Sequence, residues 1–231
     1  MTENPKNRVS VLFMLFSVLF CVCLIAANLF ETKQIAFISG TNITGGLLVF
    51  PISYIINDVV CEVYGYKKAR LLIWLGFVMN FFVVGIGALC DLLPGADYYE
   101  NGEAFHAIFG LAPRIAGASF VAFICGSFTN AFVMSRMKLR HGSRRFALRA
   151  ILSTVFGESV DSLVFFPLAF GGIIAWRELF SLMLMQIMLK TVYEIVVLPL
   201  TRRIVVAVKK YDRSDVYDNG ISYNILKIFD L

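Results

Sequence analysis

The stretch FPISYIINDVVCEVYGYKKAR, residues 50–70, decides how this chain folds. It begins inside an apolar segment, carries the carboxylates Asp58 and Glu62, and leaves through Gly65 into a basic cluster. Because residues four apart share one helix face, Tyr54, Asp58 and Glu62 would form a single polar stripe. A polar stripe in an otherwise apolar helix needs a physical reason, and that reason depends on the medium around the helix.

The composition identifies this medium as a lipid bilayer. Of the 231 residues, 58% are hydrophobic and 16% are charged, whereas soluble domains carry about 25% charged residues. The 22 Phe residues are more than a soluble core of this length would use. Apolar runs of roughly 20 residues, the length that crosses hydrocarbon, recur along the whole chain. The sequence therefore predicts an all-α integral membrane protein with one transmembrane domain over residues 1–231.

The apolar runs predict six transmembrane helices. A glycine-rich segment at 35–43 follows the first of them, and the sequence leaves open whether it re-enters the membrane. An acidic, aromatic loop is expected at 94–112, and a basic loop at 138–145. The expected spans are 9–30, 44–63, 69–93, 114–136, 147–175 and 179–208, with a tail at 209–231 that could lie on the membrane interface.

The basic residues predict the orientation. Six spans place both termini on one side, and most of the 21 Lys and Arg residues fall on that side. Lys33, Arg114 and Arg177 fall on the other side. The positive-inside rule therefore predicts cytoplasmic N- and C-termini. The net charge of +5 is explained by topology, and no nucleic-acid partner is expected.

Metal, disulfide and enzyme motifs do not stand out. The five cysteines lie in or at the edges of spans, their number is odd, and no CxxC pair exists, so no metal site, cofactor or disulfide framework is predicted. His106 and His141 both fall in loops, and neither HExxH nor GxSxG occurs. An aspartyl pair of Asp58 and Asp161 has no supporting motif. A transporter is favoured, and an intramembrane enzyme is the weakest alternative.

Ionisable and polar residues inside the spans are the candidates for function. A charge near mid-bilayer costs a few kcal/mol, so such residues face the bundle interior and often mark a site. Each group has a structural alternative: Glu62 could pair with Lys67, Arg70 or another loop, and Lys190 and Glu194 could neutralise each other. The groups are Asp58 and Glu62 in the second span, Glu158 and Asp161 in the fifth, and Gln186, Lys190 and Glu194 in the sixth.

The pair Glu158 and Asp161 is the hardest to explain as structural. Two carboxylates on neighbouring helix faces repel each other, so a proton, a cation such as Lys190 or a bound ligand must compensate. This pair predicts a substrate site near the middle of the membrane.

Several strings resemble a known family of bacterial carriers. They are Asn28–Lys33 (NLFETK), Phe50–Tyr54 (FPISY) running on to Asp58, Glu62–Lys67 (EVYGYK), Gly157–Ser162 (GESVDS) and Lys190. In this order they resemble the vitamin uptake transporter family, also called the queuosine precursor transporters, over almost the whole chain. The resemblance implies a six-span inner-membrane carrier that imports 7-deazaguanine bases, such as 7-cyano- and 7-aminomethyl-7-deazaguanine.

The implied ligand accounts for the polar residues. A deazaguanine presents two adjacent donors, N1–H and the 2-amino group, beside the acceptor O6, and a carboxylate can accept both donors. Glu158 or Asp161 would accept hydrogen bonds from that edge, Lys190 and Asn28 would donate to O6, and an aromatic side chain would stack on the base.

The expected partners are this base and the lipid bilayer, and a homodimer is left open. The candidate substrate-binding residues are Glu158, Asp161, Lys190, Asn28, Tyr54, Asp58, Phe165, Gln186 and Glu194.

The main alternative is the substrate-binding subunit of an energy-coupling-factor transporter, also a small six-helix membrane protein. Those subunits resemble one another in an Ala-x-x-x-Ala pattern on the first span. Here the first span has only adjacent Ala26 and Ala27, and the spacing falls near the fourth span, at Ala112–Ala116 and Ala118–Ala122. This weighs against the alternative, and transport by the protein alone in liposomes distinguishes the two.

Overall fold

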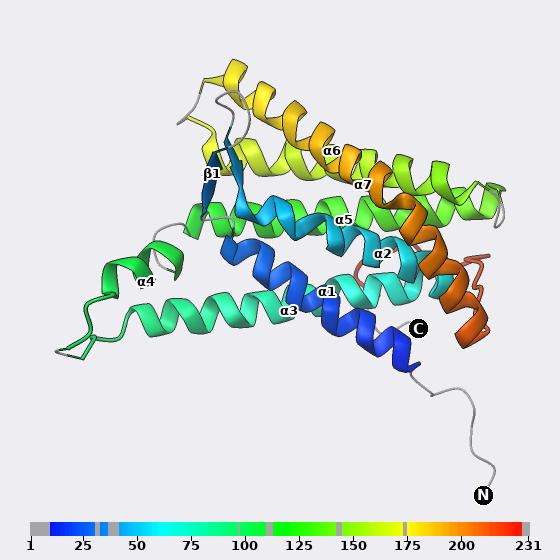
Figure 1. Cartoon of the computed structure of the whole chain (residues 1–231), viewed down its shortest axis with the longest axis horizontal. Helices are drawn as coiled ribbons and strands as arrows, with labels where there is room; N and C mark the ends of the chain where they lie inside the picture. Colours follow the sequence, from blue (N-terminus) through cyan, green and yellow to red (C-terminus); the bar gives the residue numbers. More distant parts are fainter. Residues whose placement is uncertain are drawn as a thin grey trace, which may run out of the picture.

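The computed structural model describes residues 10–30, 33–36, 42–96, 98–109, 113–141, 145–172 and 175–227. Figure 1 shows a bundle of long helices in which α1 begins and α7 ends at the same end. The elements are α1 (Val11–Phe30), β1 (Gln34–Ala36), β2 (Asn42–Thr44), η3 (Gly45–Leu48), α2 (Phe50–Tyr64), α3 (Tyr66–Asp91), α4 (Gly102–Phe109), α5 (Pro113–His141), α6 (Phe146–Phe170) and α7 (Trp176–Asp212).

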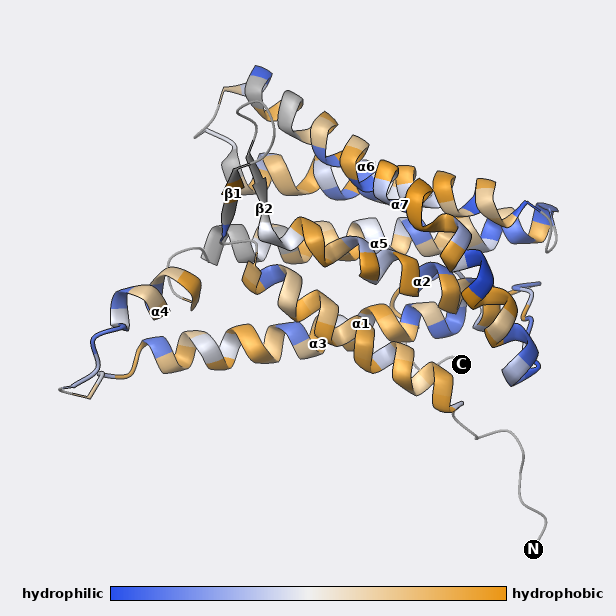
Figure 2. Cartoon of the chain, viewed as in Figure 1, coloured by the Kyte–Doolittle hydropathy of each residue, from blue (hydrophilic) through white to orange (hydrophobic). Residues whose placement is uncertain are grey.

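Six helical segments of the described chain are long and apolar enough to cross a membrane, which confirms the predicted six-span, α-helical architecture. The segment Gly45–Tyr64 is the central one, because 72% of its 18-residue apolar stretch is buried, against 17% of the corresponding stretch in Met183–Asp212. The helix α2 packs against α1, α3, α5 and α7. Hydrophobic residues cover the length of the bundle, and polar residues gather mostly at its two ends (Figure 2). The polar stripe of α2 is therefore directed into protein.

Local sequence features set the boundaries of α2. Pro51 lies in its first turn, where the missing N–H is not needed for an intrahelical hydrogen bond. Gly65 ends it with φ +85°, a value that glycine adopts readily. A Cβ on Gly65 would also lie 2.8 Å from Oδ1 of Asp218. Gly65 therefore separates α2 from α3 and makes room for the chain after α7.

Two short elements were not predicted. In the segment 35–43, the described residues belong to an antiparallel hairpin that pairs Ile35 with Ile43 and Ala36 with Asn42; residues 37–41 lie outside the described chain. The expected loop 94–112 contains the helix α4, whose Phe109 ring packs so closely on Gly87 of α3 that a Cβ there would overlap it. Both elements lie at the end opposite to the end of α7 (Figure 1).

The chain after α7 folds back onto the junction of α2 and α3. The backbone N–H of Tyr66 donates to both carboxylate oxygens of Asp218, each at 3.0 Å. Arg70 Nη1 donates to the carbonyl oxygens of Ser222, at 3.2 Å, and Asn224, at 2.9 Å. Asp218 thus occupies the N-terminus of α3, where a negative charge is stabilised by the helix dipole.

A buried ion network lies at the same end. Glu62 is 2.8 Å from Nη2 of Arg149 and 2.7 Å from Nζ of Lys209. Asp215 is 2.7 Å from Nζ of Lys138 and 2.9 Å from that of Lys209. Although partial burial opposes its ionisation, hydrogen bonds from both lysines hold the pKa of Asp215 below its usual value. Glu62 is ion-paired as the structural alternative expected, but its ion pairs between described residues are with Arg149 of α6, Lys209 of α7 and, at 4.0 Å, Lys138 of α5, and not with Lys67 or Arg70.

Candidate functional site

The centre of the candidate site is an ion cluster between α6 and α7. Nζ of Lys190 lies 2.6 Å from Oε2 of Glu158 and 3.5 Å from Oδ2 of Asp161. All three residues are at most 8% exposed. The structure thus brings together the two carboxylates and the lysine that the sequence singled out. A single ammonium group cannot balance two carboxylates, so the ionised cluster has an excess of one negative charge.

A close contact between α5 and α6 fixes the position of the two carboxylates. A Cβ on Gly126 would lie 2.9 Å from the carbonyl oxygen of Gly157, and a Cβ on Gly157 would lie 3.0 Å from the carbonyl oxygen of Gly126. The hydroxyl of Tyr54 fills the space beside Gly126, 2.6 Å from where its Cβ would be. Since Gly157 immediately precedes Glu158 in the chain, this contact sets how deeply the acidic face of α6 lies in the bundle.

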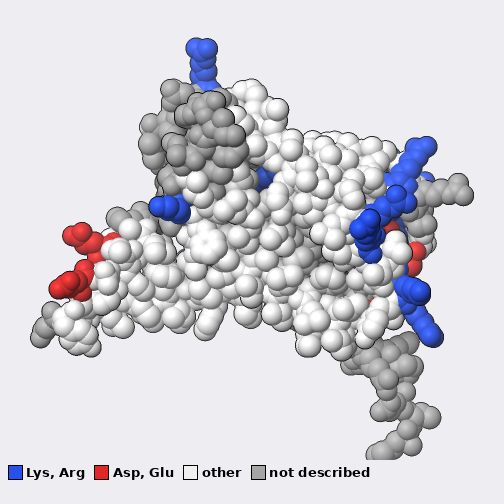
Figure 3. Space-filling model, viewed as in Figure 1, with Lys and Arg blue, Asp and Glu red and all other residues white. Residues whose placement is uncertain are grey.

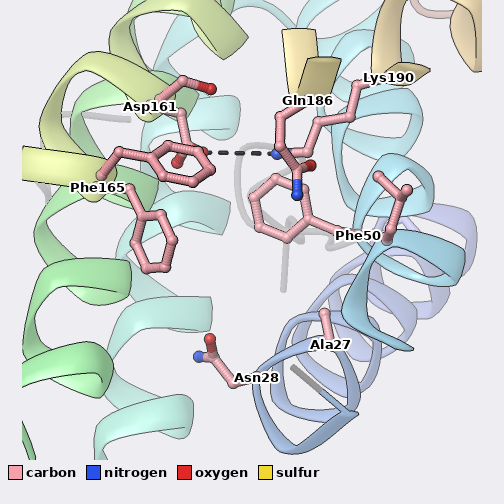
Figure 4. Close-up of a pocket in the computed structure, with 10 residues that line it drawn as sticks. Ala27, Asn28, Phe50, Asp161, Phe165, Gln186 and Lys190 are labelled. Carbon is pink, nitrogen blue, oxygen red and sulfur yellow. Dashed lines mark ion pairs between the residues drawn. The ribbon is translucent and has the colours of Figure 1, made fainter. Parts of the chain in front are cut away.

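A pocket opens beside the cluster (Figure 4). The ring of Phe50 lies 4.0 Å from Nζ of Lys190, a cation–π contact, while Asp161 and Phe165 face it across the cavity. The cavity holds about 40 Å³, far below the roughly 300–1,000 Å³ of ordinary ligand sites, so the side chains must separate to admit a purine-sized ring. The lining residues are Ala27, Asn28, Leu47, Phe50, Asp161, Ser162, Phe165, Phe166, Gln186 and Lys190.

The predicted site residues divide into two groups. Asn28, Asp161, Phe165, Gln186 and Lys190 line the pocket. The other four do not belong to its lining: Glu158 lies behind Lys190, Tyr54 is wedged at the contact between α5 and α6, and Asp58 and Glu194 lie elsewhere in the buried interior.

Phe50 is one of five lining residues that the sequence did not single out; the others are Ala27, Leu47, Ser162 and Phe166. A phenylalanine among 22 carries no distinctive signal of its own. Its position at the start of the FPISY string, one turn before Tyr54, was the available indication. Its ring packs 5.4 Å from that of Tyr54 and 5.8 Å from that of Phe123, which fixes the aromatic wall opposite Phe165.

Asp58 has a separate environment. Its Oδ1 accepts a hydrogen bond of 2.8 Å from Nδ2 of Asn130 on α5. Glu194, on α7, is also buried. Within the described ranges, no group of three or more His, Cys, Asp or Glu residues is arranged to hold a metal ion.

A family model described as "putative vitamin uptake transporter" matches residues 44–204. This chain belongs to the vitamin uptake transporter family. The matched range begins in β2, includes α2 to α6 and most of α7, and contains every candidate site residue except Asn28.

Curated relatives of this chain come from three bacteria. The chain is 30% identical over 180 residues to the "queuosine precursor transporter" of Escherichia coli, a match that covers 76% of this chain and 73% of that protein. It is 30% identical over 162 residues to the "probable queuosine precursor transporter" of Bacillus subtilis, covering 68% and 69%. A Haemophilus influenzae protein of the same name is 27% identical over 127 residues, covering 55% and 52%. No solved structure matches this chain.

Family membership and the six apolar helices together make this a multi-pass bacterial membrane protein. Its relatives are named as transporters, and a transporter of this kind has a small-molecule substrate and a lipid bilayer as partners.

Proposed function

We propose that this protein imports queuosine precursors, 7-deazaguanine bases, across the bacterial inner membrane through the pocket beside Lys190. The observation that carries the proposal is the excess carboxylate at this pocket. Asp161 lines the cavity at 3.5 Å from Lys190, whereas Glu158 lies outside the lining and holds the lysine at 2.6 Å. Together with relatives that are named queuosine precursor transporters, this favours a ligand that carries hydrogen-bond donors.

The two carboxylates have different roles in this proposal. Glu158 fixes the position of the Lys190 ammonium group, and Asp161 accepts the N1–H and 2-amino donors of the base. Such a charge-assisted, two-point contact is strong and selective. Lys190, Gln186 or Asn28 then donates to O6, since their side chains reach the same cavity. Adenine lacks the adjacent pair of donors, so it could not make this two-point contact with Asp161.

Aromatic side chains supply the remaining affinity. Phe50 and Phe165 lie on opposite sides of the cavity (Figure 4), where a flat ring can stack between them. In this proposal Tyr54 supports Phe50 and the contact between α5 and α6, because it is buried behind the pocket wall. Of the two aromatic candidates from the sequence, Tyr54 and Phe165, only Phe165 lines the pocket, so the stacking pair in this proposal is Phe50 with Phe165.

The position of the pocket suggests the direction of access. Asn28 lies near the end of α1 and Leu47 just before α2, so the cavity is in the half of the bundle that carries the hairpin. Lys and Arg side chains gather at the opposite end (Figure 3), which the positive-inside rule assigns to the cytoplasm. We take this conformation to be closed at the cytoplasmic end by the Glu62 network.

A homodimer stays a prediction, which the mass of the purified protein in detergent checks.

Transport by the protein alone is the test of this function. Purified protein in liposomes should exchange labelled 7-cyano-7-deazaguanine for unlabelled base, and cells that lack deazaguanine synthesis should need the protein to take it up. If liposomes stay inactive while cells with an energy-coupling module take up the base, the protein is a binding subunit instead. If neither system moves the base, the proposed function is wrong.

A further inference from the structure

Two buried carboxylates have no role in the pocket. Asp58 on α2 is 0% exposed and Glu194 on α7 is 1% exposed. Oδ2 of Asp58 and Oε1 of Glu194 are both buried without a hydrogen-bond partner in the described part of the chain. The other oxygen of Asp58 accepts the amide of Asn130 at 2.8 Å. Each carboxylate therefore has one oxygen that could hold a proton.

Other acidic groups act on Asp58. Its helix α2 packs against α7, which carries Glu194, so the charge of Glu194 acts on Asp58, as does that of Glu62; Ser153 of α6 also faces it. On α5, Asn130 donates a hydrogen bond to Asp58. The titratable side chains of its own helix that interact with it are Tyr54, Cys61 and Glu62.

The surroundings of Glu194 are also acidic. It acts on Asp58 of α2 and on Glu158 of α6, and both interactions are between like charges. Lys190 lies one turn before it on α7, but this ammonium group is held at 2.6 Å by Glu158. Between described residues, no ion pair within 4.0 Å joins a cationic side chain to Asp58 or Glu194.

Ionisation of both carboxylates would therefore be expensive. An isolated carboxylate loses most of its solvation when it is buried, and a second one nearby adds repulsion. A proton bound by the pair removes both costs at once. Membrane-embedded carboxylates without a cationic partner are the residues that proton-coupled carriers use for relays.

The location of the pair fits a coupling role. On α7, Glu194 lies four residues past Lys190, a rise of about 6 Å away from the pocket. On α2, Asp58 lies one turn before Glu62, whose partners are Arg149 and Lys209. The pair is thus placed between the pocket and the ion network. Since α7 carries Lys190, Glu194 and Lys209, one movement of this helix changes all three environments.

We propose that Asp58 and Glu194 form a proton-binding site that couples import of the base to entry of one proton. The proposal rests on the function proposed above. A proton from the extracytoplasmic water forms an O–H bond with one of the two carboxylates when the pocket is loaded, and it leaves to the cytoplasm with the base. The carrier returns with one proton fewer on the pair, so a neutral base moves with one positive charge. The Asn130 donor at Asp58 favours a proton over a metal cation, which would need oxygen ligands there.

The first experiment separates coupling from substrate movement. Liposomes with the membrane potential clamped at zero and a pH gradient of one unit, acidic outside, should accumulate labelled 7-cyano-7-deazaguanine about 10-fold, the limit for one proton per base. Asp58→Asn and Glu194→Gln should abolish this accumulation and keep exchange of labelled for unlabelled base within about twofold of the wild type. Glu100→Gln, on the exposed loop after α3, is the matched control and should behave like the wild type.

The outcomes distinguish the two proposals. Accumulation that follows a sodium gradient and ignores the pH gradient overturns the proton site, as do variants that still accumulate base under the pH gradient. Loss of exchange together with accumulation also overturns it, because the pair would then serve the substrate itself. If the wild-type protein carries out neither exchange nor accumulation, the proposed transport function itself is wrong.

A second measurement on the wild type does not depend on the variants folding. With a pH-sensitive dye inside the liposomes and no imposed gradient, addition of 7-cyano-7-deazaguanine outside should acidify the interior. A protonophore should remove the signal, and adenine should not produce it. An unchanged internal pH during measured uptake of the base would overturn the proposal.

Discussion

Nζ of Lys190 on α7 lies 2.6 Å from Oε2 of Glu158 on α6, and this ion pair joins the two helices that form one side of the pocket. The pair leaves Asp161, 3.5 Å from the same ammonium group, as the carboxylate that faces the cavity. One lysine thus serves both as a structural link and as part of the binding surface. We expect its removal to affect both.

The link predicts different effects for two substitutions. Glu158→Gln should lower thermal stability and uptake together, because Lys190 loses its nearest counter-charge inside the membrane, a change of about 3–5 kcal/mol for a buried pair. Lys190→Met removes the cation from Glu158 and Asp161 and should abolish uptake. The double variant Glu158→Gln with Lys190→Met should regain stability without regaining uptake. A double variant whose loss of stability equals the sum of the two single losses would show that the two side chains are not coupled.

The contact between α5 and α6 predicts that Gly126→Ala abolishes transport. The added Cβ would lie 2.9 Å from both the carbonyl oxygen of Gly157 and Cβ of Asp161, so α6 must shift together with its carboxylates. Gly117→Ala on the same helix is the matched control, because no atom of the described residues lies within 4 Å of a Cβ at that position. Uptake per folded protein should fall at position 126 and stay unchanged at 117. Equal activity of both variants would show that α6 tolerates the displacement.

The returning tail predicts a stability effect at Asp218. Its carboxylate accepts hydrogen bonds from the backbone of Tyr66 and the hydroxyl of Ser135. Loss of hydrogen bonds to a buried charged group costs about 1.5–3 kcal/mol. Asp218→Ala should therefore lower the melting temperature in detergent, while Asn219→Ala, at the exposed neighbouring position, should not. A melting temperature unchanged in Asp218→Ala would mean that the tail does not stabilise the start of α3.

The charge asymmetry predicts the topology. Single cysteines at Gly102 and Ser143, in a variant without other cysteines, should differ in labelling by a membrane-impermeant reagent. In intact cells, position 102 should be labelled and position 143 should be labelled only after permeabilisation. Labelling of 143 from outside would contradict cytoplasmic termini.

Composition and spacing predicted the elements whose cause is local. Runs of apolar residues long enough to cross the membrane require helices, because an unpaired backbone is not tolerated in hydrocarbon. The spacing of Glu158 and Asp161, together with the need for a cation, predicted the involvement of Lys190. In each case the relevant residues are close in sequence, or the chemistry allows few partners.

Contacts between distant segments could not be predicted in this way. In the sequence, Arg149 and Lys209 are simply two of the basic residues that set the membrane orientation. The structure places both against Glu62 in a buried network. Which face of a helix turns inward is poorly specified where apolar residues surround it on all sides. Asp218 falls in a segment without periodicity, and only the fold brings it to the N-terminus of α3. The assignment of Phe50 to the pocket depends on the same helix rotation.

The affinity of purified protein for 7-cyano-7-deazaguanine, measured in wild type and Asp161→Asn with Glu100→Gln as the control, tests the central claim most directly. The amide keeps the shape of the carboxylate and presents a donor to the donors of the base, so affinity should fall roughly 10- to 150-fold, the equivalent of about 1.5–3 kcal/mol. Adenine should bind neither protein. Equal affinity of wild type and Asp161→Asn for the deazaguanine, or equal binding of adenine, would contradict the account.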